Sequence, residues 1–307
     1  MLIIYTKRID LYKEVAIIAP TASGKTALSI NLAHKTNSVI LSLDSLSVYK
    51  EIEIASAKPT LEERDGIVHF GIDRIYPNEK FGVVEFIDEY QKAKNYAQKN
   101  GQNLIIVGGT SFYLKSLCEG LSKVPPISEV TKEKVKKELQ DITKSYEYLV
   151  SIDKNYMSKI ASSDKYRIEK ALELYYETRL SPTDFFQQNK PEPIIKALQI
   201  FQIDTPVDIL RERIKKRTKQ MMITGIIDEV LYLEKKYTRK PNCMKSIGIT
   251  EVLEYLDGKI DKPKLEELIS THTAQLAKRQ RTFNKSQFSN VIKDNLENLE
   301  QQILKLF

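Results

Sequence analysis

The chain has little of what marks secreted, disulfide-bonded and membrane proteins. Only two of its 307 residues are cysteine, Cys118 and Cys243, and their positions give no metal-ligand spacing. Two isolated cysteines provide no disulfide framework, so we expect a reducing, cytoplasmic compartment. No apolar run approaches the roughly 20 residues of a membrane-spanning helix, and the apolar stretch within residues 1–10 is too short for a secretory signal. These absences favour a soluble protein without a membrane partner.

Basic residues are in modest excess, and their placement is more informative than their number. The 48 lysines and arginines outnumber the 41 aspartates and glutamates, which gives a net charge of +7. Six cations fall within residues 211–220, and Lys278, Arg279 and Arg281 form a second cluster. A single run of this kind is typical of a solvated helix face. Two runs favour a polyanionic partner such as nucleic acid.

A phosphate-binding loop follows the first apolar run. Residues 15–18 are apolar, residues 27–33 have helical spacing, and the loop between them starts at Ala19, where the motif usually has glycine. Inward-pointing backbone N–H groups and the helix dipole bind a diphosphate or triphosphate in such loops, although a chance match on an ordinary turn is the alternative. We expect a lysine contact to the phosphates and a threonine ligand to Mg²⁺. The residues predicted to hold the phosphates are Ala19, Pro20, Thr21, Ala22, Ser23, Gly24, Lys25 and Thr26, of which Thr26 is the metal ligand.

The order of apolar runs predicts an α/β fold. Short runs that alternate with amphipathic stretches are typical of a parallel P-loop sheet with helices on both faces. Pro125 and Pro126 mark a boundary, after which the chain is expected to be helical until about residue 180. We predict an N-terminal extension (1–13), the first part of the core (14–122), a helical insertion (123–193), and core completion with mostly helical C-terminal residues (194–307). Predicted strands span 15–18, 38–43, 104–107, 197–203 and 290–292; predicted helices include 86–99, 128–143 and 165–178.

Asp44 follows directly after the second predicted strand. Ligands of open α/β sheets bind at the carboxyl ends of the strands, so this carboxylate should approach the phosphate-binding loop. There it could accept a proton or hold a hydrated Mg²⁺. Aspartate is equally favoured as a helix N-cap, so the residue alone leaves both roles open.

The third predicted strand has no acidic residue at its tip. P-loop proteins that hydrolyse ATP commonly carry a metal-holding aspartate there, so its absence argues against a motor or switch ATPase. The strand is followed instead by Gly108, Gly109 and Thr110. The glycines allow either a close approach to a ligand or a tight turn, and Thr110 supplies a hydroxyl.

Ordered motifs along most of the chain resemble one enzyme family. The motifs combine the phosphate-binding loop, the Asp44 segment, the glycine pair and both basic runs. They lie at residues 20–26, 44–49, 57–59, 69–73, 108–113, 167–173, 213–221, 225–230 and 277–280. In this order they resemble the bacterial tRNA dimethylallyltransferases, also called tRNA isopentenyl diphosphate transferases.

The resemblance implies transfer of a dimethylallyl group from its diphosphate to N6 of the adenine adjacent to the anticodon of tRNA. The loop would then hold a diphosphate leaving group with Mg²⁺ rather than ATP. The resemblance assigns the general base to Asp44 and diphosphate contacts to Thr110 and Arg217, so these three are the catalytic candidates. We expect the protein to act as a monomer.

The same resemblance implies residues that contact tRNA, and the sequence departs from the family pattern at a few of its positions. Ser47 stands where glutamine is common, Ile249 where tyrosine is common, and Phe283 where tryptophan is frequent. Phosphate contacts made by the basic residues predict tRNA binding that weakens as salt rises. The implied contacts are Asp44, Ser45, Leu46, Ser47, Thr110, Lys132, Arg167, Lys278 and Arg279.

Three other functions use parts of the same pattern. A small-molecule kinase would use the loop and Asp44 with ATP as the donor. A prenyltransferase acting on free AMP or ADP would use the same donor but have little need of a large basic surface. An RNA-binding module without catalysis would need only the cations.

Overall fold

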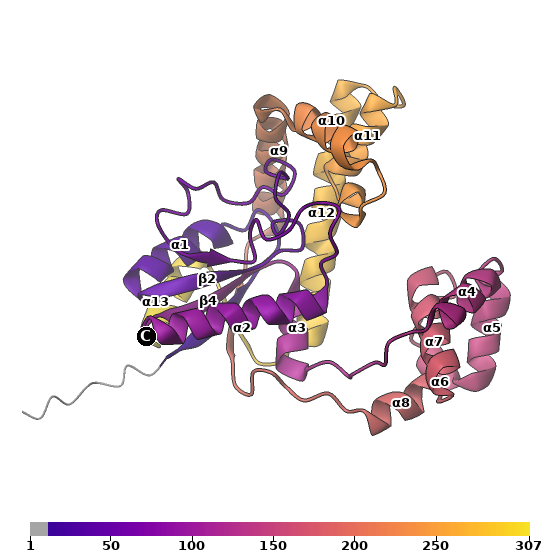
Figure 1. Ribbon diagram of the computed structural model, residues 1–307. Coiled ribbons are helices and arrows are strands. Elements are labelled where there is room, and N and C mark those ends of the chain that lie inside the picture. The colour runs from indigo at the N-terminus through magenta and orange to yellow at the C-terminus, as the bar shows by residue number, and fades with distance from the viewer. Residues whose placement is uncertain (1–11) are drawn as a thin grey trace, which may run out of the picture. The chain divides into compact units, whose positions relative to one another are not determined.

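A parallel six-stranded sheet forms the core of the chain (Figure 1). The computed structural model describes residues 12–307, so most of the predicted N-terminal extension lies outside the described residues. The strand order is β3-β2-β4-β1-β5-β6, and every neighbouring pair is parallel. The predicted α/β class with a parallel sheet is therefore confirmed.

The strands are short, and the helices that follow them vary widely in length. The strands are β1 (Glu14–Ile18), β2 (Ser38–Leu43), β3 (His69–Phe70), β4 (Asn103–Gly108), β5 (Gln199–Ile203) and β6 (Val291–Asp294). The first helices are α1 (Lys25–Lys35), α2 (Val83–Lys99), α3 (Ser111–Glu119), α4 (Glu129–Glu138), α5 (Ile142–Ile152), α6 (Lys154–Met157), α7 (Lys165–Thr178) and α8 (Pro182–Gln188). The remaining helices are α9 (Val207–Thr224), α10 (Ile226–Tyr237), the 3-10 helix η1 (Asn242–Lys245), α11 (Ile249–Leu256), α12 (Lys262–Gln287) and α13 (Leu296–Leu304).

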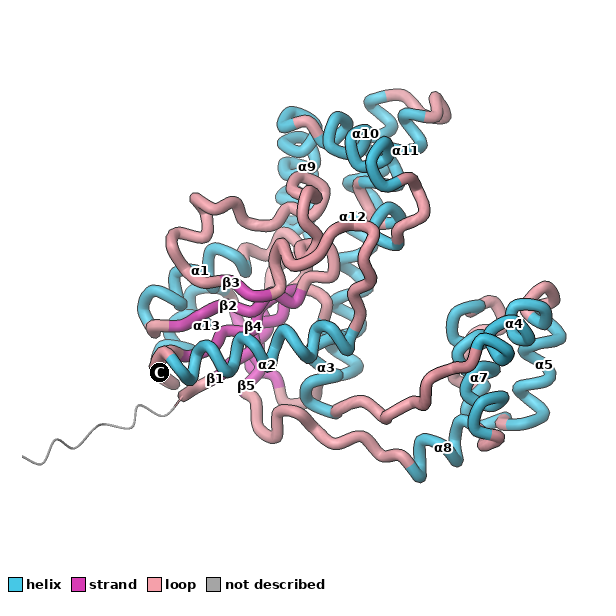
Figure 2. The backbone as a smooth tube through the Cα atoms, in the orientation of Figure 1, coloured by secondary structure: helices cyan, strands magenta, loops and turns pink. Residues whose placement is uncertain are grey.

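Helices cover both faces of the sheet, as expected from strands that are apolar at successive positions. One face packs against α1 and α13, where Leu32 and Leu299 meet Ile17 and Phe201 in one buried cluster. The other face is covered by α2, which crosses the front of the sheet in Figure 2. Side chains of a strand alternate between the two faces of the sheet, so the buried residues of β1 contribute to the apolar layers on both faces.

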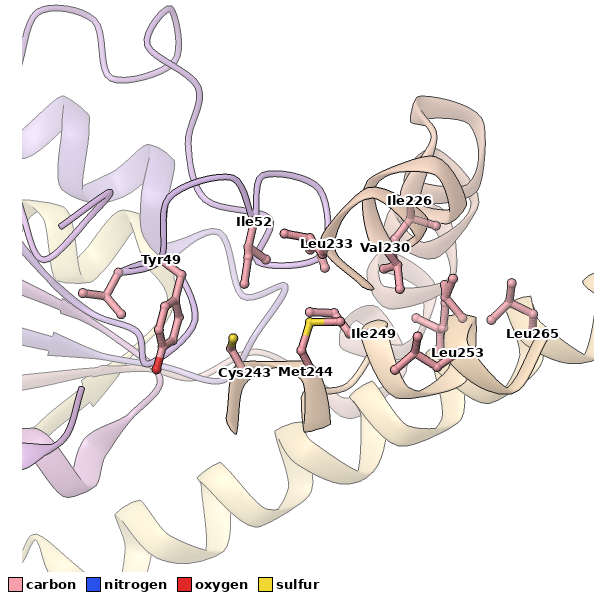
Figure 3. Close-up of a cluster of buried hydrophobic side chains, with 14 residues drawn as sticks. Tyr49, Ile52, Ile226, Val230, Leu233, Cys243, Met244, Ile249, Leu253 and Leu265 are labelled. Atoms are coloured by element: carbon pink, nitrogen blue, oxygen red, sulfur yellow. The ribbon is translucent and has the colours of Figure 1, made fainter. Parts of the chain in front are cut away.

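A second buried cluster joins the loop after β2 to the C-terminal helices (Figure 3). Tyr49 and Ile52 of this loop pack among side chains of α10, η1 and α11. The Glu229 carboxylate of α10 accepts backbone N–H bonds from Glu53 (2.8 Å), Ile54 (2.7 Å) and Ala55 (2.9 Å). These contacts hold the segment that begins with Asp44 over the carboxyl edge of the sheet.

Residues Cys118–Ile195 form a separate compact unit within the chain. Its helices α4 to α7 enclose their own core, which includes Val135, Leu149, Ile168 and Leu172. The predicted insertion covered 123–193. Helix α7 has the bounds that the sequence predicted.

The predicted helix 128–143 is wrong, because two helices occupy this stretch. Helix α4 ends at Glu138, and α5 starts at Ile142. The Asp141 side chain accepts a hydrogen bond from the Lys144 N–H at 3.1 Å, which makes it the N-cap of the second helix. Aspartate favours such local capping over a position inside a helix, so the helix ends before this residue and a new one begins after it.

Among residues 12–307, no helix is both long and apolar enough to span a membrane.

Candidate active site

A cavity of about 390 Å³ lies at the carboxyl edge of the sheet, where β1, β2 and β4 end. The phosphate-binding loop, the segment after β2, the tip of β4 and helices α9 and α12 all contribute side chains to its lining. Its polar and charged lining residues include Thr21, Lys25, Thr26, Asp44, Thr110, Arg217 and Gln280. Seven side chains from five separate segments therefore meet in one place.

The backbone of the phosphate-binding loop turns at Ala22 and Gly24. Ala22 has φ 63°, and Gly24, which precedes α1, has φ 92°. Ala19 is not among the residues with positive φ, and its N–H donates to the Gly108 carbonyl at 3.3 Å, which extends the pairing of β1 with β4. The replacement of glycine at position 19 therefore costs no backbone strain.

Lys25 is a buried cation in the cavity lining. Its Nζ lies 3.4 Å from the Pro20 carbonyl oxygen. Burial lowers the pKa of Lys25 to about 8; the Asp44 carboxylate opposes this shift, and Arg217 adds to it. A phosphate anion beside this lysine would favour its charged form and raise its pKa again.

Two arginines of α9, spaced i and i+4, fasten this helix to the phosphate-binding loop. Arg217 donates to the Thr21 hydroxyl and the Ala57 carbonyl, each at 3.0 Å. Arg213 donates to the Ser23 carbonyl at 3.1 Å. Burial lowers the pKa of Arg217, and the charge of Asp44 partly counters that effect. The sequence motifs indicated a role for Arg217 but none for Arg213, although residues four apart share a helix face.

Asp44 caps a turn rather than a helix. Its Oδ1 accepts the N–H groups of Leu46 (2.8 Å) and Ser47 (3.1 Å). The segment that follows is a run of turns, so the alternative of a helix N-cap is wrong. Among the described residues, Oδ2 has no hydrogen-bond partner, and the side chain lines the cavity. One oxygen orients the carboxylate, and the other remains available for chemistry.

The glycine pair after β4 serves close packing of protein against protein. A Cβ at Gly108 would lie 2.4 Å from the Leu43 carbonyl oxygen, and one at Gly109 would lie 2.3 Å from Nε2 of Gln280. Neither glycine has positive φ. Both glycines also line the cavity, so the predicted close approach to a ligand stays a prediction beside this packing. The Thr110 N–H donates to the Leu43 carbonyl, and the Thr110 hydroxyl accepts the Ser45 N–H at 3.3 Å. These hydrogen bonds join the tips of β4 and β2.

Gln280 bridges two walls of the cavity. Its Oε1 accepts the Thr21 N–H at 3.1 Å, and its Nε2 donates to the Gly109 carbonyl at 3.1 Å. Before the fold was known, this residue had no predicted role beyond its place in a basic motif. Only the fold brings α12 beside the phosphate-binding loop, so the spacing along the chain held no signal for this contact.

The residues predicted to contact tRNA fall in three places. Ser45, Leu46 and Ser47 line the cavity beside Asp44 and Thr110. Lys278 and Arg279 are exposed on α12 and do not belong to the cavity lining. The other two lie in the separate unit and are also exposed: Lys132 on α4, paired with Glu129 at 2.6 Å, and Arg167 on α7, paired with Asp164 at 3.3 Å.

The donor set fits a magnesium ion that is held mainly by substrate and water. Thr26 and Asp44 both line the cavity and supply a hydroxyl and a carboxylate. Within residues 12–307, no cluster of three or more histidines, cysteines or carboxylates could hold a metal by itself. Mg²⁺ commonly binds through one or two protein oxygens, several waters and the phosphates of its substrate. The Thr26 hydroxyl, with the Asp44 carboxylate in the same cavity, is compatible with this mode.

The sheet, the loop and the buried cations define an enzyme of the P-loop class that acts on a phosphate-bearing substrate. A family model described as IPP transferase matches residues 47–287. A tRNA dimethylallyltransferase of Aliarcobacter butzleri is 56% identical, over 96% of this chain and 99% of that protein. One of Sulfurovum is 55% identical, over 95% of this chain and 98% of that protein. The chain belongs to the tRNA dimethylallyltransferase family, which confirms the resemblance in the sequence.

Solved structures agree with this membership. A tRNA isopentenylpyrophosphate transferase of Bacillus halodurans aligns with a TM-score of 0.70 at 28% identity, covering 96% of this chain and 95% of that one. A eukaryotic dimethylallyltransferase acting on tRNA aligns with a TM-score of 0.80 at 27% identity, covering 94% of this chain and 75% of that one. The fold and the sequence motifs thus lead to the same family.

Proposed function

We propose that the chain transfers a dimethylallyl group from dimethylallyl diphosphate to N6 of the adenine adjacent to the anticodon of tRNA, releasing diphosphate. The observation that carries this proposal is the meeting of Lys25, Arg217 and Asp44 in one cavity whose mixed lining also includes apolar side chains. The cations match a diphosphate. The apolar side chains, among them Met221, Ile247 and Leu276, match a five-carbon hydrocarbon.

The proposed reaction is a substitution at the first carbon of the dimethylallyl group. The bond from N6 to this carbon forms, and the bond from the carbon to the diphosphate oxygen breaks with its electron pair. Adenine N6 is a weak nucleophile because its lone pair is delocalised into the ring. Removal of its proton by Oδ2 of Asp44 favours the attack. The two backbone N–H bonds to Oδ1 keep this carboxylate oriented.

The diphosphate leaving group gains negative charge as the reaction proceeds, and hydrogen-bond donors and cations of the cavity stabilise that charge. The loop N–H groups, Lys25 and Arg217 are fixed before the reaction by the contacts described above, so they need no rearrangement to stabilise that charge. Thr26 is the residue that would hold Mg²⁺, and the bound ion would neutralise diphosphate oxygens. Apolar side chains around the hydrocarbon would keep water from competing with the amine.

The basic segments support tRNA rather than a free nucleotide as the acceptor. Lys278 and Arg279 on α12, and Lys132 and Arg167 in the separate unit, are exposed cations suited to phosphate contacts. An enzyme acting on free AMP would have no use for them. A cytoplasmic site of action and a monomeric state are part of the same proposal.

The test supplies the purified protein with labelled dimethylallyl diphosphate, Mg²⁺ and unmodified tRNA. We expect label in the tRNA, in a nucleoside that digestion identifies as an N6-prenylated adenosine. Parallel reactions replace the tRNA with AMP or ADP, or the donor with ATP. Label that enters free nucleotide faster than tRNA would contradict the acceptor, and ATP consumption without transfer to RNA would indicate a kinase instead.

A further inference from the structure

Lys58 and Asp73 belong to two sequence motifs that the proposed reaction does not use, and the fold brings them together. The Lys58 side chain is only 1% exposed. Its ammonium donates to the Tyr49 carbonyl at 2.9 Å, pairs with Glu53 at 2.9 Å and hydrogen-bonds to Oδ1 of Asp73. A lysine is rarely buried to this extent unless it is paired, because removing its charge from water is costly.

The ammonium of Lys58 is fully occupied by the protein. It has three hydrogens, and Tyr49, Glu53 and Asp73 supply three acceptors. Although Lys58 is part of the cavity lining, no donor of this ammonium is left for a substrate phosphate. Its role therefore differs from that of Lys25, whose Nζ makes a single hydrogen bond within residues 12–307.

Asp73 lies between two cations. Its Oδ2 accepts a hydrogen bond from Arg64 at 2.8 Å, while its Oδ1 contacts Lys58. Burial raises the pKa of the Asp73 carboxyl, but hydrogen bonds from Arg64 and Lys58 outweigh this effect and hold the pKa below its ordinary value. Asp73 is therefore ionised, and its backbone N–H donates to the Ser47 carbonyl at 3.1 Å.

These contacts reach the turn that Asp44 organises. Ser47 is held on two sides, since its N–H donates to Oδ1 of Asp44 at 3.1 Å and its carbonyl accepts the Asp73 N–H. The Tyr49 carbonyl, two residues further along the chain, accepts from Lys58. A shift of the ammonium would therefore move the backbone that orients the proposed general base.

We propose that Lys58 is a positioning residue, which holds the Asp44 carboxylate in its catalytic orientation by anchoring the backbone of this turn. Without the ammonium, Asp73 and Glu53 lose the cation between them, and the carbonyl of Tyr49, a residue 5% exposed, loses its donor. A displacement of about 1 Å in a reacting group can lower turnover by about 10²-fold. This inference rests on the proposed function, which makes Asp44 the general base.

The cation that contacts the phosphate-binding loop has an anchor that does not depend on the ammonium. Arg217 donates to the Ala57 carbonyl, and the Ala57 N–H donates to the Ile54 carbonyl at 3.0 Å. Loss of the Lys58 charge should therefore change kcat more than KM for the donor. This split separates positioning of the base from a general loosening of the cavity.

The test is a double-mutant cycle between Lys58→Met and Asp44→Asn. Methionine keeps most of the length of the lysine side chain and removes its charge. Alone, Lys58→Met should lower kcat for prenyl transfer to tRNA roughly 10- to 100-fold, with KM for dimethylallyl diphosphate changed less than about threefold. In the Asp44→Asn background, Lys58→Met should lower kcat less than about threefold, because the base that the lysine positions is already gone.

The control is Lys35→Met. Lys35 pairs with Glu300 at 2.6 Å and does not line the catalytic cavity, so its loss should leave kcat unchanged. Circular dichroism gives the folded fraction of each variant, and rates are compared per folded protein. If Lys58→Met does not fold, Asp73→Asn takes its place in the cycle. This variant keeps the shape of the side chain and removes its charge, and its effect on kcat should again be confined to the enzyme that retains Asp44.

An equal fold-decrease of kcat in both backgrounds would overturn the proposal, because Lys58 would then not act through the base. So would an unchanged kcat, and a raised KM beside it would indicate contact of Lys58 with the diphosphate instead. Prenyl transfer by the wild type is measured first. Its absence would overturn the proposed function and this inference with it, whereas transfer by the wild type together with either result above would overturn this inference alone.

Discussion

At the scale of single residues, Asp44 combines a structural and a chemical task in one carboxylate. Oδ1 holds the turn through Leu46 and Ser47, and Oδ2 faces no protein donor within the described chain. Asparagine can keep the first contact but cannot take a proton at the second. Asp44→Asn should therefore lower turnover by roughly 10²- to 10⁴-fold while tRNA binding stays nearly unchanged. Single-turnover prenyl transfer and a tRNA binding curve check both parts.

The matched control for this prediction is Asp88→Asn, because Asp88 is an exposed carboxylate of α2 that lines no part of the cavity. It should leave the rate of transfer unchanged. Wild-type turnover in Asp44→Asn would remove the general-base assignment.

Lys25 makes the use of the donor dependent on pH. Burial brings the pKa of Lys25 to about 8 in the free protein, so the ammonium is present below that pH and lost as pH rises through it. A bound diphosphate favours the charged form, and donor binding should weaken as pH increases. We expect kcat/KM for dimethylallyl diphosphate to fall above about pH 8. A profile that stays flat up to about pH 9.5 would contradict this role.

Gln280 is expected to act by position alone. Gln280→Ala leaves the Thr21 N–H and the Gly109 carbonyl without their side-chain partner, which costs on the order of 1 kcal/mol. A loosened phosphate-binding loop should raise KM for the donor roughly fivefold, with a smaller change in kcat. Gln280→Glu keeps the acceptor for Thr21 but adds a negative charge beside the diphosphate site, so it should raise this KM further.

The control here is Gln301→Ala, an exposed residue of α13. Steady-state kinetics with the donor varied at saturating tRNA separate KM from kcat. A loss in kcat alone would indicate a different role for Gln280.

At the scale of elements, helix α10 supports the segment after β2. Glu229 accepts three successive N–H groups of this segment. Glu229→Ala should lower the free energy of unfolding by about 2 kcal/mol, because three donors lose a charged acceptor and are only partly solvated. Glu229→Gln retains one oxygen and should cost less. Urea unfolding followed by circular dichroism measures both, and equal losses would contradict the role of the carboxylate.

The elements also show what local sequence could and could not predict. The apolar runs of β1, β2 and β4 are buried along nearly their whole length, so each was visible as a run. The two residues of β3 carry no such signal, and β3 was missed. Asp141 was wrongly predicted to lie inside a helix. Its side chain accepts a hydrogen bond from the Lys144 N–H and so caps the next helix, and the helical periodicity of the sequence does not reveal this local contact.

The candidate site, too, was predictable from the sequence only in part. The motif located the loop, and the rule that ligands bind at the carboxyl ends of strands brought Asp44 and Thr110 to it. Arg213 and Gln280 reach the loop from 190 and 259 residues further along the chain. Contacts between residues so far apart in the sequence depend on tertiary packing, so they could not be predicted from local patterns in a single sequence.

At the scale of the whole molecule, exposed cations are distributed over two compact units. Arg167 belongs to the unit Cys118–Ile195, and its guanidinium pairs with Asp164 on an exposed face of α7. If it contacts an RNA phosphate, Arg167→Ala should weaken tRNA binding and reduce the salt slope by about 1. KM for the donor should stay unchanged, because every residue proposed to hold the donor lies in the other unit.

Lys144→Ala is the control, since Lys144 is an exposed cation of α5 in the same unit. Both variants lose one charge, so any long-range effect of net charge is the same in each. A loss of affinity confined to Arg167→Ala identifies a phosphate contact at that position. Equal losses in the two variants would instead show that net charge governs the affinity, and the contact assigned to Arg167 would be wrong.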